Sequence, residues 1–181
     1  MKTLYLVRHG ESQANAEGVV AGGALDSPLT ELGIAQAHKA ALQVRELDFD
    51  VFISSTMVRA VDTAEIIATE IGWTGQIEKD DRLIELDAGE ATGTSIHEYH
   101  ERLRQGEVIH QAETLQQMRD RLQDFLTDIT KRPENSFLVV SHNGTGKMIR
   151  GIVDGDTPTA FLTVPDQRNG EVLRLELHET S

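Results

Sequence analysis

The chain has 181 residues, of which 39% are hydrophobic and 26% charged, so it can bury the core of one globular domain. It contains no cysteine, which excludes a disulfide framework, a thiolate metal site and a cysteine nucleophile and agrees with the cytoplasm, the location we expect. Asp and Glu number 30 against 17 Lys and Arg, and the resulting charge of −13 argues against nucleic acid and anionic membranes as partners.

Apolar runs and helical periodicity alternate along the first half of the chain. Residues 3–7 and 51–54 are short apolar runs that predict buried strands, and residues 82–86 predict a third strand. Residues 29–47 and 58–71 repeat apolar side chains at helical spacing. Thr30 is the expected N-cap of the first helix, and Gly72 the expected end of the second.

The second half repeats this alternation after a polar interruption. We expect a helix over 114–131, a strand over 137–141, a helix over 145–153 and an edge strand over 172–177. The pattern predicts an α/β fold, a three-layer α/β/α sandwich with a mostly parallel central sheet. Because no linker or repeat interrupts it, we expect a single domain over 1–181, with a short helical cap insertion at about 94–113.

Charged side chains follow the predicted strands. In a parallel sheet the carboxyl ends of the strands meet at one edge, where ligands bind. Arginine matches phosphate oxygens, imidazole can attack phosphorus, and a carboxylic acid can protonate a leaving oxygen. Since arginines can stabilise the charge without a metal ion, we expect phosphoryl transfer with no metal or other cofactor. The side chains expected at this edge are Arg8, His9, Arg59, Glu85 and His142.

Five segments, in chain order, resemble the motifs of the histidine phosphatase superfamily, the phosphoglycerate-mutase-like phosphatases. They are LVRHGESQAN at 6–15, DSPLTELGIAQ at 26–36, SSTMVRAVDTA at 54–64, ELDAGEATG at 85–93 and VSH at 140–142. The family motifs they resemble are R-H-G-E-x-x-x-N, D-x-P-L-T-x-x-G-x-x-Q, S-x-x-x-R-A-x-x-T-A, E-x-x-x-G-x-x-x-G and V-S-H. The ordered set is far more specific than any one of them.

The resemblance implies a role for each matching residue. His9 would be the phosphorylated nucleophile, and Glu85 the acid and base. The positive neighbours of His9 should help to keep it neutral. The resemblance also implies that the phosphoryl group is held by Arg8, Arg59 and His142, with Asn15 as a further contact.

The chain departs from the family pattern in three places, one of which is AGG at 21–23, where a Gln-Gly pair is common. Asn143 stands where the family often has glycine, and its backbone amide is expected to reach the phosphate. Ala88 and Ala91 stand where aromatic residues are common, which suggests a more open pocket wall.

Two other motifs are weaker. His97 and His100 are spaced i, i+3, unlike the H-E-x-x-H of zinc proteases, so we expect surface or cap residues. The GTGK at 144–147 fails the P-loop pattern, because Ser141 and Met148 occupy positions that require Gly and Ser or Thr. Three further histidines are expected in solvent: His38, His110 and His178.

The expected function is a metal-independent phosphatase acting on a small phosphorylated metabolite through a phosphohistidine. The alternatives are a phosphoglycerate mutase and, in another class, a non-catalytic regulatory protein that binds a phosphorylated ligand. Specificity should reside in the cap insertion, where Tyr99, His100, Arg102 and Arg104 are candidates to contact the substrate. The sequence does not identify the metabolite, and it is compatible with a homodimer.

Overall fold

The computed structural model describes residues 1–177, so His178 lies outside the described residues. Its strands are β1 Lys2–Arg8, β2 Val51–Ser54, β3 Ile77–Lys79, β4 Ser136–Ser141 and β5 Val172–Leu177. Its α-helices are α1 Gln13–Glu17, α2 Glu31–Val44, α3 Val58–Ile71, α4 Ile96–Arg104, α5 Leu115–Lys131, α6 Asn143–Val153 and α7 Ala160–Thr163. No helix in this range is long and apolar enough to cross a bilayer.

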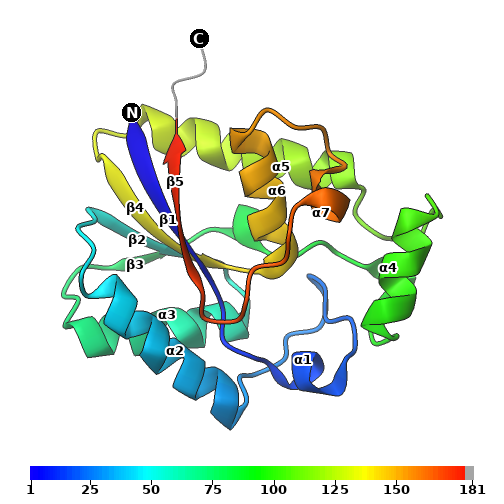
Figure 1. The fold of residues 1–181 in the computed structure, drawn as a ribbon, viewed down its shortest axis with the longest axis horizontal. Coiled ribbons are helices and arrows are strands. Elements are labelled where there is room, and N and C mark those ends of the chain that lie inside the picture. The colour runs from blue at the N-terminus through cyan, green and yellow to red at the C-terminus, as the bar shows by residue number, and fades with distance from the viewer. Residues whose placement is uncertain (178–181) are drawn as a thin grey trace.

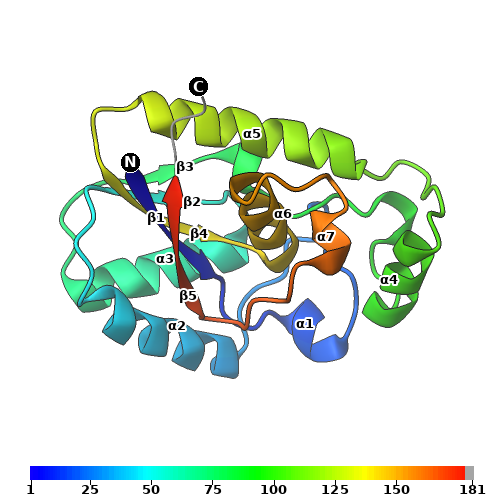
Figure 2. The same ribbon diagram turned by 45° about the horizontal axis from the view of Figure 1, so that its top comes forward.

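The five strands form one sheet in the order β3-β2-β4-β1-β5. The first four are parallel, and β5 runs antiparallel along the edge beside β1. Helices α2 and α3 cover one face, and α5 and α6 cover the other (Figures 1 and 2). The three-layer α/β/α sandwich with a mostly parallel sheet is therefore confirmed.

The alternating side chains of β4 explain why both faces are covered. Leu138 and Val140 belong to the hydrophobic cluster shared with α2 and α3, whereas Phe137 and Val139 belong to the cluster shared with α5 and α6. All four are fully buried, as expected for a central strand whose successive side chains point to opposite faces.

The expected strand over 82–86 is wrong. Residues Asp81–Leu83 form a 3₁₀ turn, and the strand of this region is the shorter β3. Side chains occupy the backbone carbonyls that a strand would need for pairing. Arg121 donates to the carbonyls of Arg82 and Ile84, and the Thr145 hydroxyl donates to that of Ile84 at 2.8 Å. Glu85 is therefore not held by a strand end.

Helix α4 lies inside the segment expected to form the cap insertion. It stands apart from the sheet at the side of the molecule (Figures 1 and 2). Tyr99 is its one buried residue. A bridge between Val19 and Ser95 ties the start of this segment to the loop after α1.

Candidate active site

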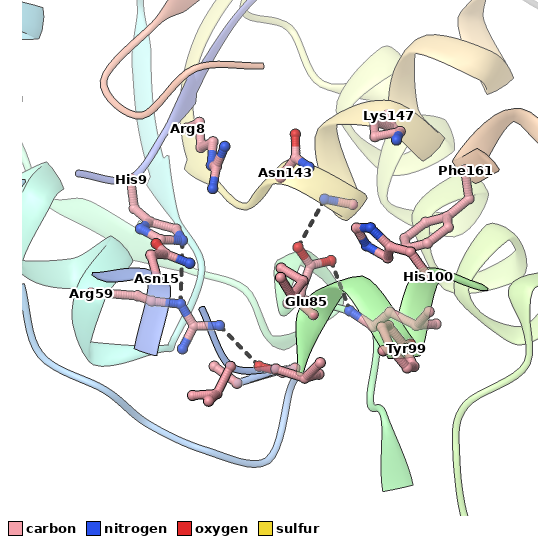
Figure 3. Close-up of a pocket in the computed structure, with 17 residues that line it drawn as sticks. Arg8, His9, Asn15, Arg59, Glu85, Tyr99, His100, Asn143, Lys147 and Phe161 are labelled. Carbon is pink, nitrogen blue, oxygen red and sulfur yellow. Dashed lines mark hydrogen bonds between the residues drawn. The ribbon is translucent and has the colours of Figure 1, made fainter. Parts of the chain in front are cut away.

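A cavity opens at the carboxyl edge of the parallel strands, beside α4 (Figure 3). It encloses about 660 Å³, part of which is open to solvent. Of the seven predicted site residues, His142 is buried beside the cavity, and the centroid of its ring lies 5.1 Å from that of the His9 ring. The other six predicted site residues line the cavity: Arg8, His9, Asn15, Arg59, Glu85 and Asn143.

The cavity has two ends, which lie on opposite sides of Glu85 in Figure 3. The His9 end is formed by Arg8, His9, Asn15 and Arg59, and the α4 end by Ile96, Tyr99, His100, Lys147 and Phe161.

The charge of the cavity is opposite to that of the whole chain. Arg8, Arg59 and Lys147 line it, against the single carboxylate of Glu85. The protein carries a net charge of −13. Such a local positive field favours binding of a small anion, whereas the negative net charge of the chain repels large polyanions.

His9 follows β1, is 3% exposed, and has a defined tautomer. Its Nδ1 lies 2.6 Å from the carbonyl oxygen of Gly10, which can only accept, so Nδ1 carries the hydrogen. The Nε2 lone pair receives the Nε–H of Arg59 at 3.3 Å. Burial, reinforced by Arg59 and Arg8, holds the pKa of His9 well below its usual 6.5. The ring is therefore neutral at pH 7, with its lone pair at Nε2.

Arg59 lies in the first turn of α3 and is held by the loop after α1. Its two terminal nitrogens donate to the carbonyls of Leu25 and Gly22, at 3.1 and 2.9 Å. Burial lowers the pKa of Arg59, and the nearby Glu85 opposes that effect. A guanidinium stays charged under these conditions, so Arg59 brings a fixed positive charge to the His9 ring.

Arg8 ends β1 and is less completely bonded. Nη1 donates to the carbonyl of Gln167 at 2.6 Å, while Nε is buried with no partner among residues 1–177. Burial lowers the pKa of Arg8, and the charges of Glu85 and Asp166 oppose this. Its remaining N–H groups are donors that can bind an anion.

His142 is the N-cap of α6 and lies against Ser55, the residue that follows β2. Its Nε2 is 2.8 Å from the Ser55 hydroxyl, and its buried Nδ1 has no partner in the described chain. Burial, followed by the charge of Arg59, holds the pKa of His142 well below 6.5.

The carboxylate of Glu85 is bound by the first turn of α6. Its two oxygens accept the N–H groups of Gly144 at 2.8 Å, Thr145 at 3.1 Å and Leu86 at 2.9 Å. A negative side chain at a helix N-terminus is favoured by the free amides and the helix dipole. Gly144 permits this approach, since a Cβ there would lie 2.4 Å from Glu85 Oε1.

The two asparagines have different surroundings. Asn15 Oδ1 accepts the backbone N–H of Ser12 in a capping box of α1. The side chain of Asn143 is bound to the loop before β5, through Asp166 Oδ1 at 3.0 Å and the N–H of Gln167 at 2.9 Å. Only the backbone amide of Asn143, in the first turn of α6, fits the expected role.

Two of the four cap candidates line the cavity, namely Tyr99 and His100. Burial, then the charge of Glu85, raises the pKa of Tyr99 above its usual range, and burial with Lys147 lowers the pKa of His100. Arg102 pairs with Glu90 and Glu107, and Arg104 pairs with Glu101; neither arginine lines the cavity.

The inference drawn from Ala88 and Ala91 is wrong. Both side chains are fully buried in the core, and neither lines the cavity. A Cβ at Gly22 would lie 3.3 Å from that of Ala88, so a larger residue at 88 would press on the loop that binds Arg59. The small residue at 88 therefore reflects the close approach of two loops.

Sequence reasoning missed Lys147 and Phe161. Lys147 pairs with Asp166 at 2.9 Å and lies 5.7 Å above the Phe161 ring. The position of Lys147, one helical turn after Asn143, was a usable signal for its side of α6. Phe161 lies in α7, whose four residues carry no periodicity. Within residues 1–177, no three His, Asp or Glu side chains are grouped to hold a metal ion.

The profile of the histidine phosphatase superfamily (branch 1) matches residues 4–181. The chain is 39% identical to the probable phosphoglycerate mutase GpmB of Enterobacter sp. (strain 638), over 99% of this chain and 87% of that protein. It is 36% identical to a Hydrogenobacter thermophilus protein provisionally named phosphoserine phosphatase 2, over 80% and 75%. With a 2,3-bisphosphoglycerate-dependent phosphoglycerate mutase of Thermoplasma acidophilum it shares 38% identity over 60% of this chain, which is about half (53%) of that mutase.

Two solved structures share the fold. YhfR of Bacillus stearothermophilus gives a TM-score of 0.87 at 25% identity, over 99% of this chain and 93% of that one. The mycobacterial glucosyl-3-phosphoglycerate phosphatase Rv2419c, in complex with VO3, gives 0.85 at 22% identity, over 97% and 93%. Since the profile spans almost the whole chain, and relatives above 30% identity include a phosphatase and mutases, this chain belongs to the histidine phosphatase superfamily.

Proposed function

We propose that this chain is a metal-independent phosphatase that hydrolyses a small phosphorylated metabolite through a phosphohistidine at His9. One observation carries the proposal: a buried, neutral His9 has its Nε2 lone pair beside Arg59, at the cationic end of a cavity. A neutral imidazole is a competent nucleophile toward phosphorus when cations hold the phosphoryl oxygens.

In the first step, Nε2 of His9 attacks phosphorus, and the bond from phosphorus to the leaving oxygen breaks. A bound phosphoryl group takes over the Nε–H of Arg59, and Arg8 donates to its oxygens, so the developing negative charge is stabilised by two guanidinium groups. The hydrogen bond from His9 Nδ1 to the Gly10 carbonyl stabilises the positive charge that the ring acquires.

Glu85 moves the protons in this scheme. Its carboxylic acid form gives a proton to the leaving oxygen, and the N–H groups of Leu86, Gly144 and Thr145 stabilise the carboxylate that remains. In the second step this carboxylate takes a proton from water as the water oxygen bonds to phosphorus. The bond between phosphorus and His9 then breaks, which releases phosphate and restores the neutral ring.

His142 supplies a further donor to the phosphoryl group. In this proposal the Ser55 hydroxyl, whose oxygen accepts the N–H of Met57, donates its hydrogen to His142 Nε2. The hydrogen of the neutral ring then lies on Nδ1, the atom with no protein partner in the described chain. Asn15 Nδ2 and the backbone N–H of Asn143 are the remaining proposed contacts.

A phosphoglycerate mutase is the second candidate, because two of the three relatives named above are phosphoglycerate mutases or probable ones. A mutase must keep water from its phosphorylated intermediate. The cavity is partly open to solvent, and Ile96 at its α4 end is 40% exposed, which supports hydrolysis over transfer.

The test is phosphate release from a generic aryl phosphate in excess EDTA, with the parent compared with His9→Ala. We expect the parent to keep its activity and His9→Ala to lose at least about a thousandfold in kcat/KM. His38→Ala is the matched control, since this surface histidine of α2 pairs with Glu70.

Each part of the proposal can fail separately. Loss of activity in EDTA contradicts metal independence, and activity retained by His9→Ala contradicts the nucleophile. Isomerisation of 3-phosphoglycerate without phosphate release supports the mutase. Binding across a panel of phosphorylated metabolites without any turnover supports a regulatory protein.

A further inference from the structure

The segment between α7 and β5 includes residues 166–169, which contact both α6 and the residue that follows β1. Asp166 Oδ1 accepts hydrogen bonds from Asn143 at 3.0 Å and Lys147 at 2.9 Å, both on α6. Asn169 Nδ2 donates to the carbonyl of His9 at 3.0 Å. The segment therefore links the first turns of α6 to the end of β1.

Gln167 is the buried residue of this segment, with 1% of its surface exposed. Its Nε2 donates to the carbonyls of Leu6 at 3.0 Å and Glu171 at 2.7 Å. Its backbone N–H donates to Asn143 Oδ1 at 2.9 Å. Connecting segments usually run over the surface, and a buried amide is tolerated when its hydrogens are bonded. The Gln167 side chain thus fixes the segment against β1 and the start of β5.

The carbonyl of Gln167 accepts the only hydrogen bond that the Arg8 guanidinium makes within residues 1–177. Arg59 differs, because its guanidinium donates to two loop carbonyls and to the His9 ring. The orientation of the planar Arg8 guanidinium therefore depends on one carbonyl. If that carbonyl shifts, the guanidinium shifts with it.

Helix α6 leaves room for this arrangement. A Cβ at Gly146 would lie 3.0 Å from Gln167 Oε1 and 3.3 Å from Leu6 Cδ2. A larger residue at 146 would therefore press on the Gln167 amide and on β1 together. The absence of a side chain at 146 keeps the amide between α6 and β1.

We propose that Gln167 is a positioning residue for Arg8, whose side chain anchors the carbonyl that orients the guanidinium toward the phosphoryl group. The inference rests on the proposed function, in which Arg8 binds that group. Gln167 itself does not line the cavity.

The first experiment compares Gln167→Met with the parent, because methionine keeps the length of the side chain and removes both amide hydrogens. We expect kcat/KM for an aryl phosphate to fall about ten- to a hundredfold, and inhibition by inorganic phosphate to weaken. The matched control is the adjacent, exposed Arg168→Ala, which should keep the parent's values.

A double-mutant cycle with Arg8→Met separates positioning from a loss of stability. If Gln167 acts through Arg8, adding Gln167→Met to Arg8→Met lowers kcat/KM by less than about twofold. A repeat of the full loss in that background overturns the inference while the role of Arg8 stands. If Arg8→Met alone leaves kcat/KM unchanged, the proposed role of Arg8 fails as well.

Gln167→Glu gives an independent reading should Gln167→Met not fold. An ionised carboxylate has no hydrogen for the carbonyls of Leu6 and Glu171, whereas the protonated form has one. The ratio of its kcat/KM to that of the parent should therefore rise as the pH falls. A ratio that stays flat with pH overturns the inference.

Discussion

The two ends of the cavity are built in different ways. At the His9 end, Arg8 and His9 come directly from the end of β1, and Arg59 comes from the first turn of α3 after β2. At the α4 end, Tyr99 and His100 come from a helix that stands apart from the sheet (Figure 2). Strand β1, which carries Arg8 and leads to His9, pairs with β4 along six residues. Helix α4 lies outside the sheet, and the start of its segment is tied to residues 18–20 by a short bridge and a few backbone hydrogen bonds.

This difference indicates a division of labour. The His9 end has buried, hydrogen-bonded groups, as pre-organised stabilisation of a transition state requires. The α4 end mixes apolar side chains with the Lys147–Asp166 ion pair and is more exposed. We expect changes at the His9 end to affect turnover of all substrates, and changes at the α4 end to affect the choice among them.

Glu85 lies where the two ends meet, and its substitution should have a larger effect on activity than substitutions at the α4 end. Glu85→Gln cannot donate the proton that an alkyl leaving group needs, so we expect kcat for alkyl phosphates to fall about a hundredfold. For aryl phosphates, whose leaving groups need less protonation, kcat should fall far less. Phosphate release from the two substrate classes measures the difference.

The control is Glu90→Gln, because Glu90 pairs with Arg102 outside the cavity. Glu85→Gln should also destabilise α6 by about 1–2 kcal/mol, since its amide nitrogen would face a backbone N–H. An equal loss of activity for both leaving groups would show that Glu85 is only an anchor for α6.

The pH dependence of stability sharpens the description of the His9 end. Folding lowers the pKa of His9 and His142, so below pH 6.5 the unfolded chain binds the extra protons. The contribution of the two neutral rings to the free energy of unfolding is complete above pH 6.5 and is lost as the pH falls. Each ring should lower the free energy of unfolding by at most about 1.4 kcal/mol for each pH unit below 6.5. Urea unfolding at pH 7.5 and 5.5 measures the loss.

His142→Asn should remove one ring's share of that loss. His97→Asn is the matched control, since its ring is exposed on α4 and hydrated in both states. If the free energy of unfolding depends on pH in both variants as it does in the parent, the inference that the buried rings are neutral is wrong.

Substitutions at the α4 end should give the smallest and most selective effect. Lys147→Met and His100→Ala should shift the ratio of kcat/KM between substrates with different distal groups by about tenfold. Inhibition by inorganic phosphate should stay within about twofold of the parent value. Arg102→Ala is the control, because this residue pairs with Glu90 and Glu107 away from the cavity. An equal loss of kcat/KM for every substrate would contradict the separate roles of the two ends.

The sequence alone determined most of the scaffold. Helices α2, α3 and α5 were predicted because apolar spacing and capping are local signals, and Thr30 and Gly72 are the caps that form. Strands β1, β2, β4 and β5 were predicted from short apolar runs. The meeting of Arg8, His9, Arg59 and His142 also followed from the sequence, since parallel strands present their carboxyl ends at one edge.

Tertiary contacts decided the rest. Glu85 was predicted at a strand end, but the first turn of α6, 59 residues away in the chain, holds its carboxylate. The orientation of Arg8 depends on a carbonyl 159 residues away. No local pattern encodes such contacts, because they form when separate segments pack together. The sequence therefore determined which groups reach the edge of the sheet, and the folded structure determined how each is oriented and bonded there.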